Sequence, residues 1–371
     1  MQNNYRQIKF TGDIFRVSYR QRPTQDGNIK WLYHALKNPL ELATSLPIEM
    51  ELYSKEDISL VSSGYRMIGE NISMEAWPRL FYHDDLSEEF LQQVWLSFRN
   101  SIVVAFELPE LLKSALDRLN IPYIDIIIHP VRFLDDLVFG IRSNSREVAE
   151  LLHTYLVPDE TILIQAGLVI ASMNRLKRLK IPGKAAFFAG QTTDDKVLIN
   201  QGKFHNVSDF LEQFEEIAAS YDTIVIKSHP YTRDPFEAIS ISRLFNNCIT
   251  VTDNFYYLMS HDNIEAVYSI SSSTSIEARY LGKKGYHLAN YPFKFTEDFN
   301  EAEFQLGSFF TIDDVIFSAD FWRKILTPLV STTPTTGIKL PKKPNRIRTS
   351  LRSFWGFNFV DTDIICQLHG K

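Results

Sequence analysis

The sequence predicts an α/β protein in which two parallel-sheet domains face each other across a central cleft. Short apolar runs alternate with amphipathic stretches along most of the chain, as expected for strands and the helices that cover them. The 371 residues, 44% of them hydrophobic, are enough to bury two cores. A basic segment that ends in Pro182-Gly183 has the composition of a linker between them.

The first half is expected to contain one parallel βαβ unit, because two apolar runs closely flank an amphipathic stretch. In order, we expect helices at Ile29–Leu42 (stopped by Pro39) and Phe90–Phe98, then the βαβ unit at Ser101–Phe106, Pro109–Leu119 and Ile124–Ile128, then helices at Arg132–Arg142 and Glu147–Tyr155. Thr161–Met173 is apolar and fits a strand or a helix.

The second half alternates strands and helices more regularly, which is typical of a doubly wound parallel sheet. We expect strands at Lys184–Ala189, Thr223–Ile226, Cys248–Val251, Ala266–Ile270 and Gly285–Leu288, with helices at Asp209–Ser220 (capped by Ser208), Pro235–Phe245, Phe255–Ser260, Ser275–Leu281 and Phe317–Leu329. The predicted domains are therefore residues 1–182, residues 183–316, and a helix with a tail, residues 317–371, that packs back on the first domain.

Composition excludes several classes of protein. The net charge of −6 leaves no basic field for nucleic acid. The two cysteines, Cys248 and Cys366, form neither a disulfide framework nor a metal-binding spacing, so we expect a cytoplasmic protein. The N-terminus lacks a signal sequence, and no apolar run is long enough to span a membrane. The basic and aromatic C-terminal stretch, residues 339–359, either packs on the first domain or touches the cytoplasmic face of the inner membrane.

Polar side chains follow two of the predicted strands in the second half, where ligands bind in open α/β sheets. Lys227, His229 and Pro230 follow one strand, and five hydroxyl residues, 271–275, follow the other. Thr274 with Glu277 three residues later predicts a capping box, so Ser271, Ser272 and Ser273 would surround a helix start that attracts phosphate. Each motif alone also fits a simple cap or turn. Together they favour a nucleotide-sugar site.

A third motif, Gly190-Gln191 followed by Asp194-Asp195, completes a set that resembles the bacterial CMP-Kdo-dependent β-Kdo glycosyltransferases of capsule and lipopolysaccharide assembly. The other two motifs of the set are His229-Pro230 and the serine-rich Ser271–Ala278, and the resemblance covers residues 100–290. It implies a GT-B architecture of two Rossmann-like domains. It also implies retaining transfer of Kdo to a lipid-linked surface glycan, such as a capsule, lipopolysaccharide or O-antigen chain.

The resemblance implies a carboxylate nucleophile at Asp195, with Asp194 as the second choice, and a donor contact from Gln191. From its position at a strand end we take Glu107 as the candidate general base. We expect His229 to contact phosphate or cytidine, and Lys227 or Arg233 to pair with the donor carboxylate. His129 either lies on the acceptor side or only marks the end of a strand.

We expect no metal, because a CMP sugar carries no diphosphate to neutralise. Three alternatives remain at this point. They are a CMP-sialic acid transferase, which uses a related donor, a UDP-sugar epimerase of the same architecture, and a nucleotide-binding assembly protein without turnover.

Overall fold

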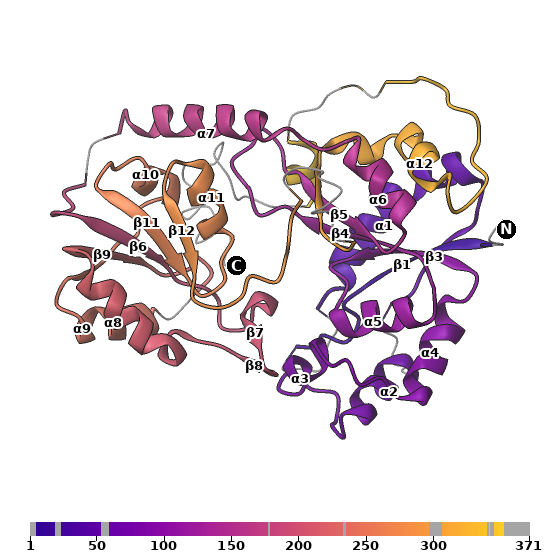
Figure 1. Cartoon of the computed structure of the whole chain (residues 1–371), viewed down its shortest axis with the longest axis horizontal. Helices are drawn as coiled ribbons and strands as arrows, with labels where there is room; N and C mark the ends of the chain where they lie inside the picture. The colour runs from indigo at the N-terminus through magenta and orange to yellow at the C-terminus, as the bar shows by residue number, and fades with distance from the viewer. Residues whose placement is uncertain are drawn as a thin grey trace.

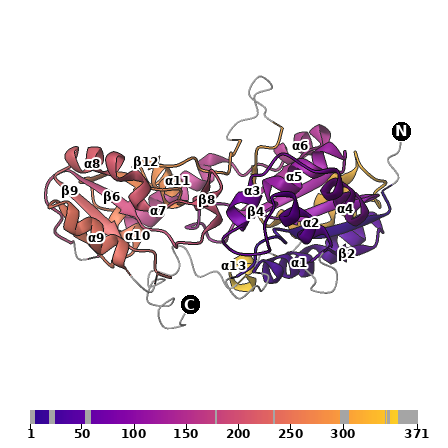
Figure 2. The same cartoon turned by 90° about the horizontal axis from the view of Figure 1, so that it is seen from below.

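The structure, a computed structural model, describes residues 5–18, 24–52, 59–176, 179–232, 235–296, 306–339, 341 and 345–351. Within these residues the strands form a six-stranded sheet, a five-stranded sheet and a two-stranded ribbon. The two large sheets lie in separate lobes (Figure 1, and from below in Figure 2). The first sheet comes mainly from the first half of the chain but includes a strand from residues 310–312, and the second comes from the second half. The predicted α/β class is therefore confirmed.

The first sheet has a parallel part and an antiparallel edge. Its order is β13 (Phe310–Ile312), β5 (Phe139–Ser143), β4 (Tyr123–Ile128), β3 (Ser101–Phe106), β1 (Gln7–Gly12) and β2 (Ile48–Met50). Strands β2, β1, β3 and β4 are parallel, whereas β5 pairs antiparallel with β4 and with β13. The chain order reverses between β1 and β3, so a ligand-binding crevice is expected beyond their carboxyl ends.

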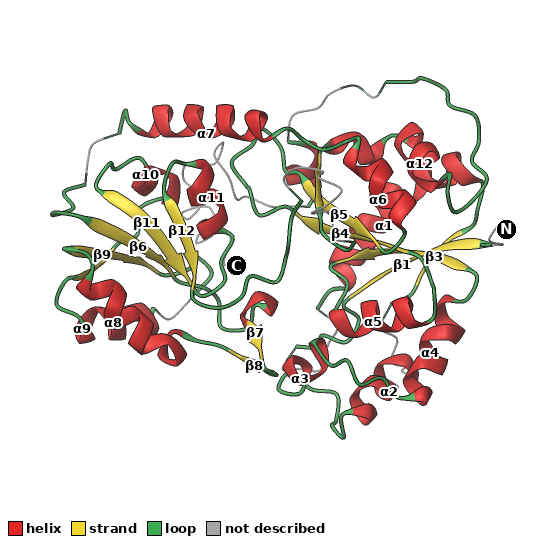
Figure 3. Ribbon diagram, in the orientation of Figure 1, coloured by secondary structure: helices red, strands yellow, loops and turns green. Residues whose placement is uncertain are grey.

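Helices cover both faces of this sheet (Figure 3). They are α1 (Asp26–Thr44), α2 (Ser59–Met67), α3 (Trp77–Phe81), α4 (Glu88–Phe98), α5 (Glu110–Arg118), α6 (Arg146–His153), α12 (Ala319–Leu326) and α13 (Arg346–Ser350). Helix α5 joins β3 to β4, which confirms the βαβ unit. The expected stop at Pro39 is wrong: α1 runs through this residue, which is buried on its core-facing side, so apolar packing outweighs the lost hydrogen bond.

The helix predicted at Arg132–Arg142 is also wrong. Residues 132–138 are irregular and lead into β5, which pairs with β4. The Asp136 carboxylate accepts hydrogen bonds from the backbone N–H groups of Ile347 and Arg348 in α13 (2.8 and 3.0 Å). Apolar residues in this stretch are spaced as in a helix, but strand pairing and these distant contacts decide its conformation.

The second sheet is wholly parallel and has the order β10 (Cys248–Thr250), β9 (Thr223–Lys227), β6 (Ala185–Ala189), β11 (Ile264–Ser269) and β12 (Lys284–His287). Helices α7 (Asp159–Met173), α10 (Phe255–Met259) and α11 (Thr274–Tyr280) share one apolar cluster on one face. Helices α8 (Leu211–Ala219) and α9 (Phe236–Leu244) share another on the opposite face. The expected strands are confirmed, and the ambiguous Thr161–Met173 is helical.

The C-terminal part of the described chain belongs to the first lobe. Helix α12 packs on α1, and its Trp322 is fully buried and donates to the Ile316 carbonyl (2.6 Å). Most of the basic and aromatic tail, including Phe354–Phe359, lies outside the described residues. Among the residues that are described, no helix combines the length and the hydropathy needed to cross a membrane.

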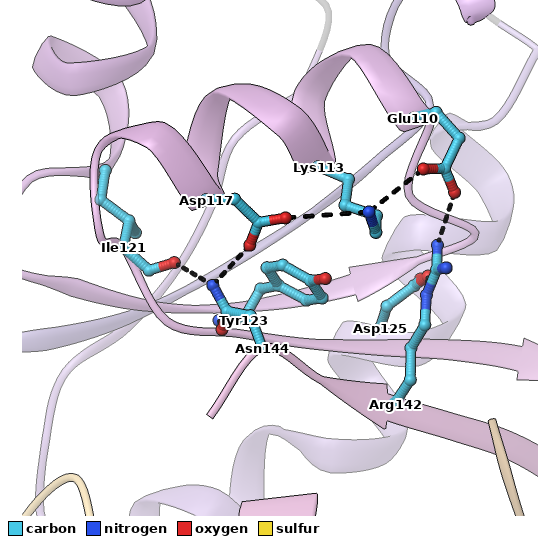
Figure 4. A network of polar contacts seen from close by, with 8 residues as sticks. All are labelled: Glu110, Lys113, Asp117, Ile121, Tyr123, Asp125, Arg142 and Asn144. Atoms are coloured by element: carbon cyan, nitrogen blue, oxygen red, sulfur yellow. Dashed lines mark hydrogen bonds and ion pairs between the residues drawn. The ribbon is translucent and has the colours of Figure 1, made fainter. Parts of the chain in front are cut away.

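A polar network ties helix α5 to strands β4 and β5 (Figure 4), and its Asp125 also fixes the loop that follows β3. Asp125 on β4 is fully buried, and one of its oxygens accepts from the backbone N–H of Leu108 (2.9 Å). Its other oxygen accepts from Arg142 Nε (2.8 Å), and Arg142 Nη2 also reaches Glu110 (3.3 Å). The pair therefore positions Glu107, which precedes Leu108 and lies at φ 57°, a conformation that strains residues other than glycine.

We predict that Arg142→Leu lowers the free energy of unfolding by about 3 kcal/mol, because it leaves the Asp125 carboxylate buried without its cation. Urea unfolding measures this change. The matched control is Arg146→Leu, whose pair with Glu150 is solvent-exposed and should cost less than about 0.5 kcal/mol. Equal losses in the two variants would contradict a special role for the buried pair.

Candidate active site

One cavity of about 320 Å³ lies where the carboxyl ends of strands from both lobes meet. This volume is within the range of small-molecule sites. The lining from the first lobe includes Glu107, Ile128 and Arg132. The lining from the second lobe comes from the loops that follow β6, β9 and β11, the start of α10, and residues 291 and 293. A crevice is expected beyond β1 and β3 in the first sheet, and another beyond β6 and β11, where the strand order of the second sheet reverses. The two crevices thus face a shared space.

Two glycines let neighbouring strand ends approach closely, one between β1 and β3 and the other between β6 and β9. A Cβ on Gly12, at the end of β1, would lie 2.4 Å from the carbonyl oxygen of Phe106 at the end of β3. A Cβ on Gly190, after β6, would lie 3.0 Å from the carbonyl oxygen of Lys227, which accepts the Gly190 N–H at 2.8 Å. Side chains at either position would push apart the loops that line the cavity.

The loop after β6 brings the Lys196 ammonium group against the Glu107 carboxylate of the first lobe. Lys196 is buried, and its Nζ lies 2.5 Å from Glu107 Oε2 and 5.1 Å from the centre of the Phe293 ring. Asp195 caps the short 3₁₀ helix Lys196–Leu198 by accepting from the Val197 N–H (3.3 Å). Burial raises the pKa of Asp195, while the Val197 hydrogen bond and the charge of Lys196 oppose the rise. The charge of Lys196 therefore favours the ionised form of the buried Asp195 carboxylate.

The same loop continues into a ribbon that anchors it to the first lobe. Strands β7 (Ile199–Asn200) and β8 (Lys203–Phe204) form this ribbon. The Phe204 ring packs 5.8 Å from the Trp77 ring, and Ile199 joins the core of the first lobe. The ribbon thus holds the loop that contains Asp195 and Lys196 against the first lobe.

A second contact between the lobes involves Asp194. Arg16 Nη2 donates to the Asp194 backbone carbonyl (2.8 Å) and lies 3.6 Å from its carboxylate. Arg16 stacks on Trp77, whose Nε1 donates to Asp13 (3.1 Å). Burial raises the pKa of Asp13 to about 6. Asp194 does not line the cavity, so of the predicted acidic pair only Asp195 faces it.

The predicted capping box is wrong. The N-cap of α11 is Ser273, its side chain makes no capping hydrogen bond, and the Thr274 N–H bonds to Ser272 Oγ (3.3 Å). The preceding loop is held differently: Gln191 Oε1 accepts from the Ser271 N–H (2.8 Å), which ties the loops after β6 and β11 together. Gln191 and residues 271–274 nevertheless line the cavity, as predicted for a donor site.

Glu277 points away from its own helix start and across to the first lobe. Its Oε1 accepts from the backbone N–H of Arg132 (2.6 Å) and from the Tyr256 hydroxyl (3.0 Å). Burial raises the pKa of Glu277 to about 7, against these hydrogen bonds. The residue expected to cap a helix instead joins the two lobes at the cavity wall.

The two His-Pro motifs have the same local geometry after β4 and β9. In each, the histidine Nδ1 accepts a backbone N–H two residues further on, from Val131 (3.1 Å) or Tyr231 (3.2 Å). A neutral ring held this way carries its proton on Nε2. Burial lowers the pKa of His129 to about 3 and that of His229 to about 4, so both rings are neutral at physiological pH. His229 lines the shared cavity, whereas His129 lines a neighbouring one.

Two cations were expected near a donor carboxylate, Lys227 or Arg233. Lys227 lines the cavity, but its Nζ donates to the Thr252 carbonyl (3.0 Å), and Arg233 lies outside the described residues. Sequence reasoning missed Arg132, which lines the cavity. In the described part of the chain no hydrogen bond or ion pair involves its guanidinium. Tyr291 and Phe293, also missed, complete an aromatic wall.

No group of three or more metal-ligating side chains occurs within the described ranges. No protein-family model matches the chain, and no curated protein matches its sequence. Two solved structures from Thermosulfurimonas dismutans are similar to it at a distance. One, titled KpsC beta Kdo 2,7 transferase, is 13% identical and covers 75% of this chain and 77% of its own, with a TM-score of 0.39. The other, titled KpsC beta Kdo 2,4 transferase, is 12% identical and covers 86% and 90%, with a TM-score of 0.36.

We predict that Glu277→Gln changes the pH dependence of stability. The folded pKa of about 7 exceeds the ordinary value of 4.5, so the folded state binds this proton more tightly than the unfolded state. The resulting stabilisation is complete below pH 4.5 and is lost as the pH rises to 7, which amounts to about 3 kcal/mol. Glutamine keeps an oxygen for both hydrogen bonds and removes this loss.

Urea unfolding at a series of pH values checks the expectation. The variant should gain stability over the native protein as the pH rises from 5 to 8. Glu216→Gln on the exposed face of α8 serves as the control. Parallel pH profiles for the native protein and Glu277→Gln would show that the buried carboxyl does not titrate in this window.

Proposed function

We propose that the chain is a glycosyltransferase that moves a sugar acid, Kdo, from CMP-Kdo to a glycan acceptor with retention of configuration. The observation that carries the proposal is the convergence of Asp195 and Glu107, from opposite lobes, on one cavity in which Lys196 pairs with Glu107. The cavity also has the side chains that a nucleotide monophosphate needs, namely hydroxyls, a neutral imidazole and aromatic rings.

In the first step the Asp195 carboxylate would attack the anomeric carbon of the donor. The bond from this carbon to the phosphate oxygen breaks, CMP leaves with the electron pair, and a glycosyl ester forms on Asp195. Lys196 supports this step because its charge opposes protonation of the buried nucleophile. His229 and Ser272 would contact the departing phosphate from the loops after β9 and β11.

In the second step an acceptor hydroxyl would attack the same carbon and displace the Asp195 carboxylate. Glu107 would take the hydroxyl proton, because it is the carboxylate that the first lobe presents to the cavity. Two successive inversions give net retention. The strained backbone of Glu107 and the fixed loop behind it support a positioned base.

Arg132 would bind the carboxylate of the sugar acid. A guanidinium matches a carboxylate with two parallel hydrogen bonds. The adjacent backbone N–H of Arg132 is fixed by Glu277, so the side chain enters the cavity from an anchored point. This role is additional to those expected for Lys227 and Arg233, and it would favour a donor with an acidic sugar. In the proposed GT-B architecture, the first lobe would supply Arg132 and the acceptor side, and the second lobe would supply most of the donor side.

We predict that Asp195→Asn reduces turnover by at least about 10³-fold, since it removes the nucleophile. Intact-mass measurement with CMP-Kdo and no acceptor should detect a Kdo adduct on Glu107→Gln and none on Asp195→Asn. Asp194→Asn is the matched control, because its backbone carbonyl still bonds Arg16 and its side chain lies outside the cavity. An adduct on Asp195→Asn, or inactivity of Asp194→Asn alone, would move the nucleophile elsewhere.

We predict that Arg132→Gln separates the sugar acid from the nucleotide. In an Asp195→Asn background, affinity for CMP-Kdo should fall about 10- to 100-fold while affinity for CMP stays unchanged, because only the sugar carboxylate loses its partner. Calorimetry measures both. Equal losses for the two ligands would place Arg132 at the phosphate. Thermal stabilisation by UDP and not by CMP would overturn the donor itself and favour a UDP-sugar enzyme.

A further inference from the structure

Helix α7 is apolar on both of its sides. Its inner side packs into the second lobe through Ile162, Ala166, Val169 and Met173. Its outer side exposes Leu163 (52%), Ile164 (57%) and Leu168 (55%), and the residues between and after them on this side are Gly167 and Ala171, also exposed. From residue 163 to residue 171 the solvent-facing stripe therefore has no polar side chain.

This stripe departs from what a surface helix normally shows. Helices of globular proteins place charged and polar residues opposite the buried face. Single exposed aliphatic residues are common, but a continuous row marks a surface that contacts another apolar phase. A Cβ built on Gly167 meets nothing within 4 Å, so this side of the helix is open at that point. Helix α7 itself runs along the outside of the second lobe beside α10 and α11 (Figure 1).

The sign of the charge changes along helix α7, from acidic residues at its start to basic residues after its end. Asp159 and Glu160 occupy its first turn. The segment that follows its C-terminal end, RLKRLK, has four basic residues in six, of which Arg175 and Lys180 are described and exposed. The apolar row is therefore followed in sequence by a basic segment, of which Arg175 and Lys180 are described, and an apolar surface next to basic residues is the combination that binds anionic lipid headgroups beside an acyl phase.

We propose that α7 attaches the protein to an anionic membrane surface. The helix would lie in the plane of the interface, with Leu163, Ile164 and Leu168 at the headgroup–acyl boundary and Arg175 and Lys180 on lipid phosphates. Its 15 residues are too few for the roughly 20 that cross a bilayer. Three half-exposed aliphatic side chains also fall well short of the roughly 800 Å² per partner that a stable dimer buries, which favours lipid over a second copy.

Vesicle flotation with the full chain tests the proposal without any donor or acceptor, so its outcome is independent of the enzymatic proposal. The native protein should float with vesicles containing phosphatidylglycerol at low salt and remain unbound with pure phosphatidylcholine. Leu163→Gln/Leu168→Gln should lower the partition coefficient at least about tenfold. Arg175→Gln/Lys180→Gln should lower it by a similar factor and remove its salt dependence.

The matched control is Phe236→Gln/Leu244→Gln on α9. It also removes two exposed apolar side chains (71% and 64%), but on the opposite face of the second sheet, and it should bind like the native protein. Circular dichroism and melting temperature verify folding of all variants. Failure of the native protein to bind anionic vesicles overturns the proposal. So does binding that the α7 variants leave unchanged, or a native dimer that they convert to a monomer.

Discussion

The buried ion pair between Lys196 and Glu107 is the interaction on which the shared cavity depends, because its two charges come from different lobes. An ammonium and a carboxylate that both lose water are stable only near each other, so separation of the lobes would leave each of them unpaired. The β7–β8 ribbon and the bond from Arg16 to the Asp194 carbonyl hold the same loop in place by packing and hydrogen bonding. The ion pair, the ribbon and the Arg16 hydrogen bond together hold the Asp195 and Glu107 carboxylates at one site.

The cost of this arrangement is visible in the titratable groups around the cavity. Burial is the largest influence on Asp13, Asp195, His229 and Glu277, and in every case it disfavours the charged form. A fold selected for stability alone would replace such groups with apolar side chains. Their concentration where the two sheets meet, and the strained backbone of Glu107, are the physical marks of a functional site.

Much of the fold follows from local patterns, and the errors occur where local patterns compete with distant contacts. The strands from β3 to β12 are short apolar runs between turn residues, and all but β5 and the small ribbon strands were predicted. Strand β5 was taken for a helix because its pairing with β4 and the contact between Asp136 and α13 join residues far apart in sequence. Glu277 lies three residues after Thr274, as in a capping box, but its carboxylate instead accepts hydrogen bonds from the Arg132 N–H and the Tyr256 hydroxyl.

The candidate site divides in the same way. His229 and the serine loop were predicted because strand ends in a parallel sheet are recognisable in sequence, whereas Asp195 was predicted from the family resemblance of its loop. Lys196 and Arg132 were missed, because nothing in their neighbourhoods shows that each faces a group from the other lobe. In the sequence, Lys196 beside two aspartates is typical of a solvated turn. Only the structure shows that its partner, Glu107, lies against it.

The membrane-facing helix and the cavity use different sides of the second lobe. The cavity lies at the carboxyl edge of the sheet, whereas the apolar row of α7 faces outward from one of its layers. Helix α7 nevertheless packs directly on α10 and α11, whose first residues line the cavity. A bilayer bound to α7 would therefore leave the cavity open to a soluble donor. It would also hold, through one layer of packed side chains, the two helices whose first residues line the cavity.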